Sequence, residues 1–339
     1  MKIKNKNFTN KTFIIAEIGN NHEGSFKNAL KLISKAADCG VDAVKFQYIV
    51  PELFISPLEK KRIKQLNNFL LSKKQFIKLK KHALKKKVIF FSSCFDEESA
   101  NFLNSLQNLF KIASCDNNYF GLIKKIIKFN KPVLISLGLT EGKDTENLIK
   151  FINTLLINNK KRITLMHCVS SYPVLPENAN LNKIDYLIKK YPNYNIGYSD
   201  HTKGIEASCI AVSKGAKVIE KHFTLSKKFS SFRDHQLSAD PKEMELLVKN
   251  IRNIEKLIKN NPTLSKDERK NIKNLRRSVF VKKTILKNSY LKKTDLICLR
   301  PGHGISPDLI GALIGKKLKN TVTPLRPIKF KDIFVKKKN

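Results

Sequence analysis

Apolar runs typical of buried strands alternate with amphipathic runs typical of helices over about the first three quarters of this 339-residue chain. In the helical run at 25–39, for example, Leu32, Ile33 and Ala36 share one broad face. Strands that alternate with helices predict a parallel sheet, and eight such pairs predict a (β/α)8 TIM barrel. The predicted strands are residues 13–19, 43–47, 88–93, 109–114, 132–138, 162–169, 195–201 and 217–224. The predicted helices are residues 25–39, 73–87, 97–106, 121–129, 145–157, 183–191, 203–215 and 241–258.

A doubly wound parallel sheet is the alternative fold, because the helix at 73–87 begins far along the chain from the strand at 43–47. The count of eight strands and the absence of a Gly-rich phosphate loop from the sequence favour the barrel.

The character of the sequence changes after the barrel region. Residues 259–275 are polar and rich in lysine and asparagine, as linkers often are. Short β-like pieces separated by Gly and Pro turns follow. We therefore expect a barrel domain at 1–258, a linker at 259–275 and a small β-rich domain at 276–339.

Composition limits the cellular setting. Hydrophobic residues make up 41% of the chain, which is enough for a sizeable core, and no apolar run reaches the length of a membrane helix. The basic segment at 1–7 is not followed by an apolar signal core, so we expect a cytoplasmic protein without a membrane partner. The six cysteines form no Cys-x-x-Cys pair, which argues against a structural zinc site and a disulfide framework.

The net charge of +38 allows two interpretations. One is a nucleic-acid-binding face, and the other is lysine spread over solvated helix surfaces. We favour the second and expect no nucleic-acid partner, because the excess is mostly lysine, is dispersed, and includes no Arg-rich tract. An anionic substrate would still be attracted by the positive field.

Two lysines, Lys45 and Lys111, lie inside predicted barrel strands, where lysine is rarely buried without a partner. In a TIM barrel the side chains at the carboxyl ends of the strands form the site. Lysines among hydroxyls there predict an anion site such as one for phosphate, unless both lysines point outward between the helices. Serines at or just after neighbouring strand ends are Ser114, Ser136, Ser170 and Ser199.

Two histidines, His201 and His222, end the last two predicted strands and lie 21 positions apart, as expected for one strand, one helix and the next strand. Side chains alternate along a strand, so Glu220 shares a face with His222, whereas Asp200 faces away from His201. Two imidazoles with a carboxylate beside them predict a divalent-metal site. The alternative is a pair of hydrogen-bonded core histidines.

Six motifs, in this order and at barrel spacing, resemble those of the sialic acid synthase (N-acetylneuraminate synthase) family, from about Phe13 to Ile333. The segment after Arg276 resembles the family's antifreeze-like (SAF) domain. The motifs are IAEIGNNHEG at 15–24, VKFQ at 44–47, FKIAS at 110–114, SDHT at 199–202, EKHF at 220–223 and RPGHG at 300–304.

The resemblance implies an enzyme that joins phosphoenolpyruvate to an open-chain N-acetylated amino sugar, such as N-acetylmannosamine or a related hexosamine. The products would be a sialic acid or related nonulosonic acid and phosphate. It also implies a divalent ion of the manganese type, with Mg²⁺ or Co²⁺ as alternatives, and a domain-swapped homodimer. By resemblance, Glu17, Glu220 and Asp234 are catalytic, and His201 and His222 bind the metal. The residues that bind substrates by resemblance are Lys45, Lys111, Ser114, Asp116, Ser136, Ser170, Tyr172, Ser199 and Arg300. Of these, Arg300 is expected to reach the site of the partner subunit.

The sequence departs from the family pattern in three segments. Cys115-Asp116 replaces the usual Gly-Glu, Cys94 replaces a proline after the third strand, and the segment at 230–233 replaces Pro-Gly-Pro. These changes fall on the sugar side, so the acceptor is left open. The alternatives are legionaminate or pseudaminate synthesis, another phosphoenolpyruvate-dependent aldol-type synthase acting on a sugar phosphate, and a catalytically silent sugar-binding homologue.

Overall fold

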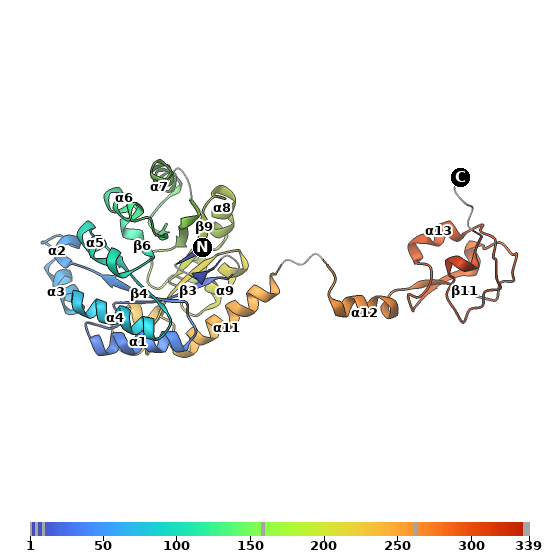
Figure 1. The fold of residues 1–339 in the computed structure, drawn as a ribbon, viewed down its shortest axis with the longest axis horizontal. Helices are drawn as coiled ribbons and strands as arrows, with labels where there is room; N and C mark the ends of the chain where they lie inside the picture. The colour runs from blue at the N-terminus through green and yellow to red at the C-terminus, as the bar shows by residue number, and fades with distance from the viewer. Residues whose placement is uncertain (1, 4–5, 9–10, 157–159, 260–262, 335–339) are drawn as a thin grey trace. The chain divides into compact units, whose positions relative to one another are not determined.

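The computed structural model of the protein describes residues 2–3, 6–8, 11–156, 160–259 and 263–334. The chain divides into two compact units, Met1–Lys259 and Asn260–Asn339 (Figure 1).

Within the described residues of the first unit, eight parallel strands close into a barrel with the order β10-β3-β4-β5-β6-β7-β8-β9. Helices surround it (Figure 1), so the predicted TIM barrel is confirmed. All eight strands overlap the predicted ones: β3 (Phe13–Gly19), β4 (Ala43–Tyr48), β5 (Ile89–Cys94), β6 (Phe110–Ile112), β7 (Val133–Ser136), β8 (Ile163–Cys168), β9 (Asn195–Asp200) and β10 (Val218–His222).

Among the described residues of this unit, the helices include the eight predicted ones and three short additions, α2 (Pro51–Phe54), α3 (Lys60–Asn68) and α10 (Asp234–Leu237). Two of the additions fill the long stretch between β4 and α4, which explains the irregular pairing there. Helix α4 begins at a capping box formed by Ser72 and Gln75, and α11 begins at one formed by Asp240 and Glu243. The helices are α1 (Phe26–Asp38), α2 (Pro51–Phe54), α3 (Lys60–Asn68), α4 (Lys73–Lys85), α5 (Glu97–Leu106), α6 (Phe120–Lys128), α7 (Gly142–Leu155), α8 (Asn182–Lys190), α9 (Glu206–Ser213), α10 (Asp234–Leu237) and α11 (Pro241–Leu257). Short 3-10 turns are η1 (Ser114–Asp116), η2 (Lys160–Arg162) and η3 (Pro176–Asn178).

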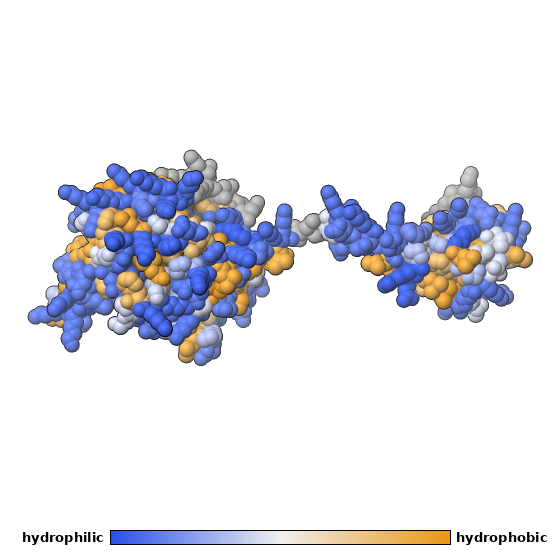
Figure 2. Space-filling model, turned by 90° about the horizontal axis from the view of Figure 1, so that it is seen from below, coloured by the Kyte–Doolittle hydropathy of each residue, from blue (hydrophilic) through white to orange (hydrophobic). Residues whose placement is uncertain are grey.

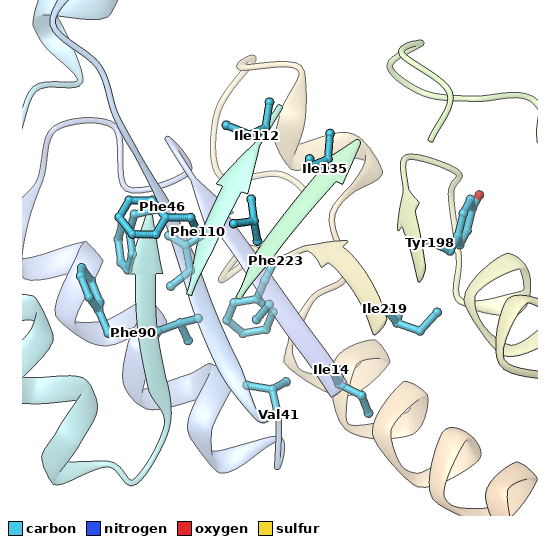
Figure 3. Packing of buried hydrophobic residues seen from close by; sticks show 14 of the residues in the cluster. Ile14, Val41, Phe46, Phe90, Phe110, Ile112, Ile135, Tyr198, Ile219 and Phe223 are labelled. Carbon is cyan, nitrogen blue, oxygen red and sulfur yellow. The ribbon is translucent and has the colours of Figure 1, made fainter. Parts of the chain in front are cut away.

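The main hydrophobic core lies between the outer face of the barrel and the helices (Figure 3). Phe46 of β4 and Phe90 of β5 pack with their ring centroids 5.6 Å apart, and Phe76 of α4 contacts both. Burial of these large apolar side chains fixes one face of each strand outward, so the alternate residues must point into the barrel.

The interior of the barrel is apolar at its amino-terminal end. Phe13, Phe91 and Met166 lie in one buried cluster there, together with Phe8, which follows the antiparallel strands β1 (Lys2–Ile3) and β2 (Lys6–Asn7). Space is so limited that a Cβ on Gly197 would lie 2.4 Å from the sulfur of Met166. The closed apolar floor leaves the opposite, carboxyl end of the barrel for polar side chains.

The second unit has its own core around the antiparallel strands β11 (Ser278–Val281) and β12 (Leu296–Leu299). The segment predicted as a linker contains α12 (Lys266–Leu275), which starts at a capping box of Ser265 and Glu268. The backbone amide of Gly302 donates to Lys273 O at 2.7 Å, so this helix is joined to the second unit. Its remaining elements are η4 (Lys293–Asp295), η5 (Pro307–Leu309), α13 (Ile310–Leu313) and η6 (Phe330–Asp332).

Hydrophilic residues cover much of the face of each unit that Figure 2 shows, in agreement with charge dispersed over the surface. In the part of the chain that the structure describes, every helix is too short or too polar to span a bilayer.

Candidate active site

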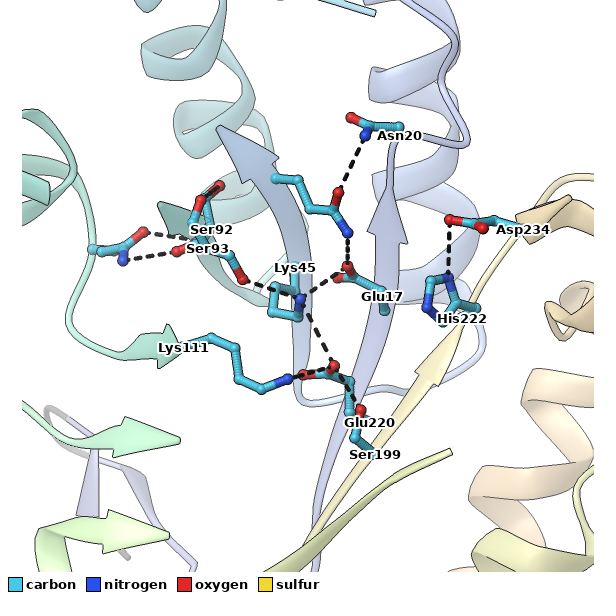
Figure 4. A network of polar contacts seen from close by, with 12 residues as sticks. Glu17, Asn20, Lys45, Ser92, Ser93, Lys111, Ser199, Glu220, His222 and Asp234 are labelled. Carbon is cyan, nitrogen blue, oxygen red and sulfur yellow. Dashed lines mark hydrogen bonds and ion pairs between the residues drawn. The ribbon is translucent and has the colours of Figure 1, made fainter. Parts of the chain in front are cut away.

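Four charged side chains meet above the apolar floor, and we call Glu17, Lys45, Lys111 and Glu220 the charged cluster (Figure 4). They project inward from β3, β4, β6 and β10, and each is at most 4% exposed. Lys45 Nζ lies 2.9 Å from Glu17 Oε1 and 3.7 Å from Glu220 Oε1. Lys111 Nζ donates to both carboxylate oxygens of Glu220, at 2.8 and 3.0 Å. The lysines therefore point into the barrel, as the anion-site interpretation requires.

The protonation of the charged cluster reflects burial and the opposite charges within it. Burial raises the pKa of Glu17, and the attraction of Lys45 only partly opposes this effect. Burial also disfavours the charge on Glu220, but Lys111 and Lys45 outweigh it and lower the pKa of Glu220 to about 2. Desolvation of Lys45 is likewise outweighed by Glu17 and Glu220, which raise its pKa. Glu220 is thus the firmly ionised member, whereas Glu17 ionises less readily.

Hydroxyl groups surround the charged cluster. Ser199 Oγ donates to Glu220 Oε1 at 3.1 Å. The buried Oγ atoms of Ser114, Ser136 and Ser170 have no hydrogen-bond partner among the described residues. A Cβ on Gly138 would lie 2.6 Å from Ser114 Oγ and 2.5 Å from Ser170 Oγ, so glycine keeps the space between these two hydroxyls open. Buried donors without partners are rare and indicate a site for a ligand that accepts hydrogen bonds.

His201 and His222 lie at the same end of the barrel with ring centroids 5.3 Å apart. His201 Nδ1 donates to Val169 O at 2.8 Å, so Nε2 is the nitrogen that carries the lone pair when the ring is neutral. Burial, together with the charges of His201 and Lys45, lowers the pKa of His222 well below its usual value, so its ring is neutral. The buried Nδ1 of His222 has no hydrogen-bond partner in the described residues. The Tyr172 ring lies 4.3 Å from that of His201.

The two imidazoles fit a divalent ion that takes its remaining ligands from substrate or water. The neutral His222 ring has the chemistry of a metal ligand, and its unpartnered, buried Nδ1 is an atom that such an ion could satisfy. Burial disfavours the charge on His201, but Cys168 outweighs burial and raises the pKa of this ring, which must give up its proton to bind an ion. Within the described ranges, no group of three or more His, Cys, Asp or Glu side chains is arranged to hold a metal.

The structure brings most of the other predicted residues to this end of the barrel. Asp234, at the start of α10, has its Oδ2 3.9 Å from His222 Nδ1. Asp116 lies in η1 directly after β6, and the Cys115 thiol donates to its carboxylate at 3.5 Å. Burial raises the pKa of Asp116 to about 6. Arg300 belongs to the second unit, where its side chain is exposed after β12.

A buried ion pair joins β9 and β10 on the opposite face of these strands. Asp200 and Lys221 are fully buried, are partners in the strand register, and lie 3.1 Å apart from Oδ2 to Nζ. Each directly precedes one of the two histidines, so the pair holds the two strands together at the positions that carry His201 and His222.

Two further polar residues, which had no predicted role, contact the charged cluster. Gln47 Nε2 donates to Glu17 Oε1 at 3.1 Å, and Lys45 Nζ donates to Ser93 Oγ at 3.3 Å. Both residues lie at the ends of predicted strands, and two-residue alternation from Lys45 places Gln47 inside the barrel. That alternation was the available signal for Gln47.

Comparisons with known proteins identify the family of this chain. A model of the NeuB family matches residues 32–262, and a model of the SAF domain matches residues 276–333. The chain is 38% identical over 323 residues to N,N'-diacetyllegionaminic acid synthase of Campylobacter jejuni, covering 90% of this chain and 95% of that protein. It is 33% identical over 327 residues to N-acetylneuraminate-9-phosphate synthase of Homo sapiens, covering 91% and 89%.

A solved structure extends the likeness to three dimensions. The N-acetylneuraminic acid synthetase of Leptospira borgpetersenii matches with a TM-score of 0.74 and 34% identity, over 80% of this chain and 94% of that one. The resemblance predicted from the six motifs and from the SAF-like segment is therefore confirmed.

Proposed function

This chain belongs to the NeuB family of synthases, and we propose that it condenses phosphoenolpyruvate with an N-acetylated amino sugar to give a nonulosonic acid and phosphate. The observation that carries the proposal is the pairing of two buried lysines with unpartnered serine hydroxyls at the carboxyl end of one barrel. Such a site offers charge-assisted donors to the phosphate and carboxylate of phosphoenolpyruvate.

The residues divide between the two halves of the reaction. C3 of phosphoenolpyruvate attacks the aldehyde carbon of the open-chain sugar, water adds to C2, and the C2–O bond to phosphate then breaks. Lys45, Lys111 and the serine hydroxyls orient the phosphate and stabilise its charge as it leaves. Glu17 Oε2 is buried without a hydrogen-bond partner among the described residues, whereas Oε1 already accepts from Gln47. We assign Glu17 the proton exchange at the sugar oxygen, through Oε2.

We propose that His201 and His222 hold a divalent ion of the manganese type. When bound, such an ion supplies Lewis acidity at the carbonyl oxygen of the sugar. The backbone hydrogen bond of His201 fixes its tautomer and the direction of Nε2. Tyr172, packed against the His201 ring, and Asp234, close to His222, line the sugar side.

We also propose that the enzyme is a domain-swapped homodimer in which Arg300 completes the site of the partner subunit. The support is the sequence resemblance at 300–304 and the exposure of this side chain in the SAF unit. A guanidinium can pair with a carboxylate through two parallel hydrogen bonds, which lysine cannot do.

The test is a panel of N-acetylated hexosamines incubated with phosphoenolpyruvate and Mn²⁺. Phosphate release and the mass of the product are measured for each sugar. At least one sugar should give phosphate together with a product that has gained the three carbons of pyruvate. Phosphate release without such a product, or no release with any panel member, would contradict the proposed reaction.

A further inference from the structure

One buried amide, that of Asn117, joins two segments that carry serine hydroxyls of the site. Asn117 directly follows the turn η1 and is 5% exposed. Its Nδ2 donates to Ser136 O at 3.1 Å and to Gly138 O at 2.8 Å. An amide nitrogen carries two hydrogens, so one is available for each of these bonds. The side chain therefore ties the turn after β6 to the end of β7.

This link lies where the barrel sheet no longer connects the two strands. The register between β6 and β7 ends at the pair of Ile112 and Ile135. Ser114, in η1, and Ser136, the last residue of β7, both lie beyond that pair. The side-chain amide of Asn117 thus takes over from the backbone hydrogen bonds at the point where the hydroxyls begin.

The spacing that Asn117 controls is narrow. The buried Oγ atoms of Ser114 and Ser136 have no hydrogen-bond partner among the described residues. A Cβ on Gly138 would lie 2.6 Å from Ser114 Oγ and 3.1 Å from Ser114 Cβ, so the backbone here packs closely against this serine. The amide binds the carbonyl of the same glycine. A small shift of η1 relative to β7 would therefore displace the hydroxyls or close the space between them.

We propose that Asn117 is a positioning residue of the phosphoenolpyruvate site, where it holds the hydroxyls of Ser114 and Ser136 at the separation that the ligand requires. This inference rests on the proposed function and adds to it a residue that acts through the two serines. Donors stabilise a bound anion best when they are fixed in place beforehand, because binding then does not have to order them. The lysines of the charged cluster have their own carboxyl partners, so loss of the amide should disturb the hydroxyls and leave the lysines in place.

The first measurement is equilibrium binding of phosphoenolpyruvate by calorimetry, in the absence of sugar. The test variant is Asn117→Leu, which removes the amide without adding charge, and the matched control is Asn118→Leu, the same change at the exposed next residue. The Kd should rise about tenfold or more in the test variant and less than about twofold in the control. Asn117→Ser, whose side chain is too short to reach both carbonyls, should weaken binding in the same direction and does not depend on the fit of a leucine.

The second measurement separates positioning from general damage to the fold. For variants that keep the native urea-unfolding transition, the KM for phosphoenolpyruvate should rise about tenfold while the KM for the sugar changes less than about twofold. Variants that bind phosphoenolpyruvate as the native protein does, or an equal rise in both KM values, would overturn the inference and leave the proposed function intact. A native protein that binds no phosphoenolpyruvate would overturn both.

Discussion

Replacement of Lys221 by methionine should destabilise the barrel more than the loss of any exposed lysine. Lys221 is fully buried and its ammonium group donates to Asp200 Oδ2 at 3.1 Å and to Thr202 O. Loss of one partner of a buried ion pair leaves the other charge uncompensated, at a cost of about 3–5 kcal/mol. Asp200 keeps hydrogen bonds from Tyr198, Thr202 and Ser208, so we expect about 3 kcal/mol, the lower end of that range.

The assay is urea unfolding followed by far-ultraviolet circular dichroism. The matched control is Lys217→Met, the same change at an exposed position just before β10, which should alter the free energy of unfolding by no more than about 0.5 kcal/mol. In the double variant Asp200→Asn/Lys221→Met, the two losses should be non-additive by about 1 kcal/mol or more, because both charges are gone. A Lys221→Met protein as stable as the control, or strict additivity in the double variant, would refute the reasoning.

Four further outcomes are expected. Chelation should abolish turnover and added Mn²⁺ should restore it, and an undiminished rate after chelation would exclude a metal role. The His201→Ala protein should bind Mn²⁺ at least about tenfold more weakly than the native protein, as measured by equilibrium dialysis. Lys45→Met or Lys111→Met should raise the KM for phosphoenolpyruvate, or lower kcat, by about tenfold or more, and a change confined to the sugar KM would contradict the phosphate assignment. Arg300→Ala and His201→Ala proteins, each inactive alone, should regain part of their activity when mixed and allowed to exchange subunits; heterodimers without activity would exclude the swapped arrangement. In the folded state the pKa of the Asp116 carboxyl is raised to about 6, well above its usual value. The folded state therefore binds more protons than the unfolded state, and native stability falls as the pH rises from about 4 to about 6. Asp116→Asn should remove this fall, which amounts to about 2 kcal/mol between the two pH values, pH 4.5 and pH 7, at which urea unfolding is measured.

The inward residues of the barrel could be predicted because side chains alternate along each strand. Once the apolar residues face the helices, the alternate residues must point into the barrel. Lys45, Lys111 and Glu220 each follow that alternation, and all three lie inside. The partner of Lys221 could not be predicted, because it depends on the register between β9 and β10, which sequence periodicity does not specify.

Residues outside the regular elements were harder to place. Asn117 lies directly after the short turn η1, where no periodic pattern guides a prediction. Its contacts with Ser136 O and Gly138 O form only when this turn and the end of β7 lie side by side at the same end of the barrel. Such long-range juxtapositions leave no local trace in one sequence.

Both lysines of the charged cluster have a carboxyl partner before any ligand arrives, Lys45 beside Glu17 and Lys111 beside Glu220. An incoming anion must therefore exchange places with an internal counterion instead of entering a vacant positive site. The same exchange runs in reverse when an anionic product leaves, because Glu220 can return to Lys111 as soon as the product moves away. The two carboxyl groups thus compete with an anionic ligand for the lysines, which weakens product retention.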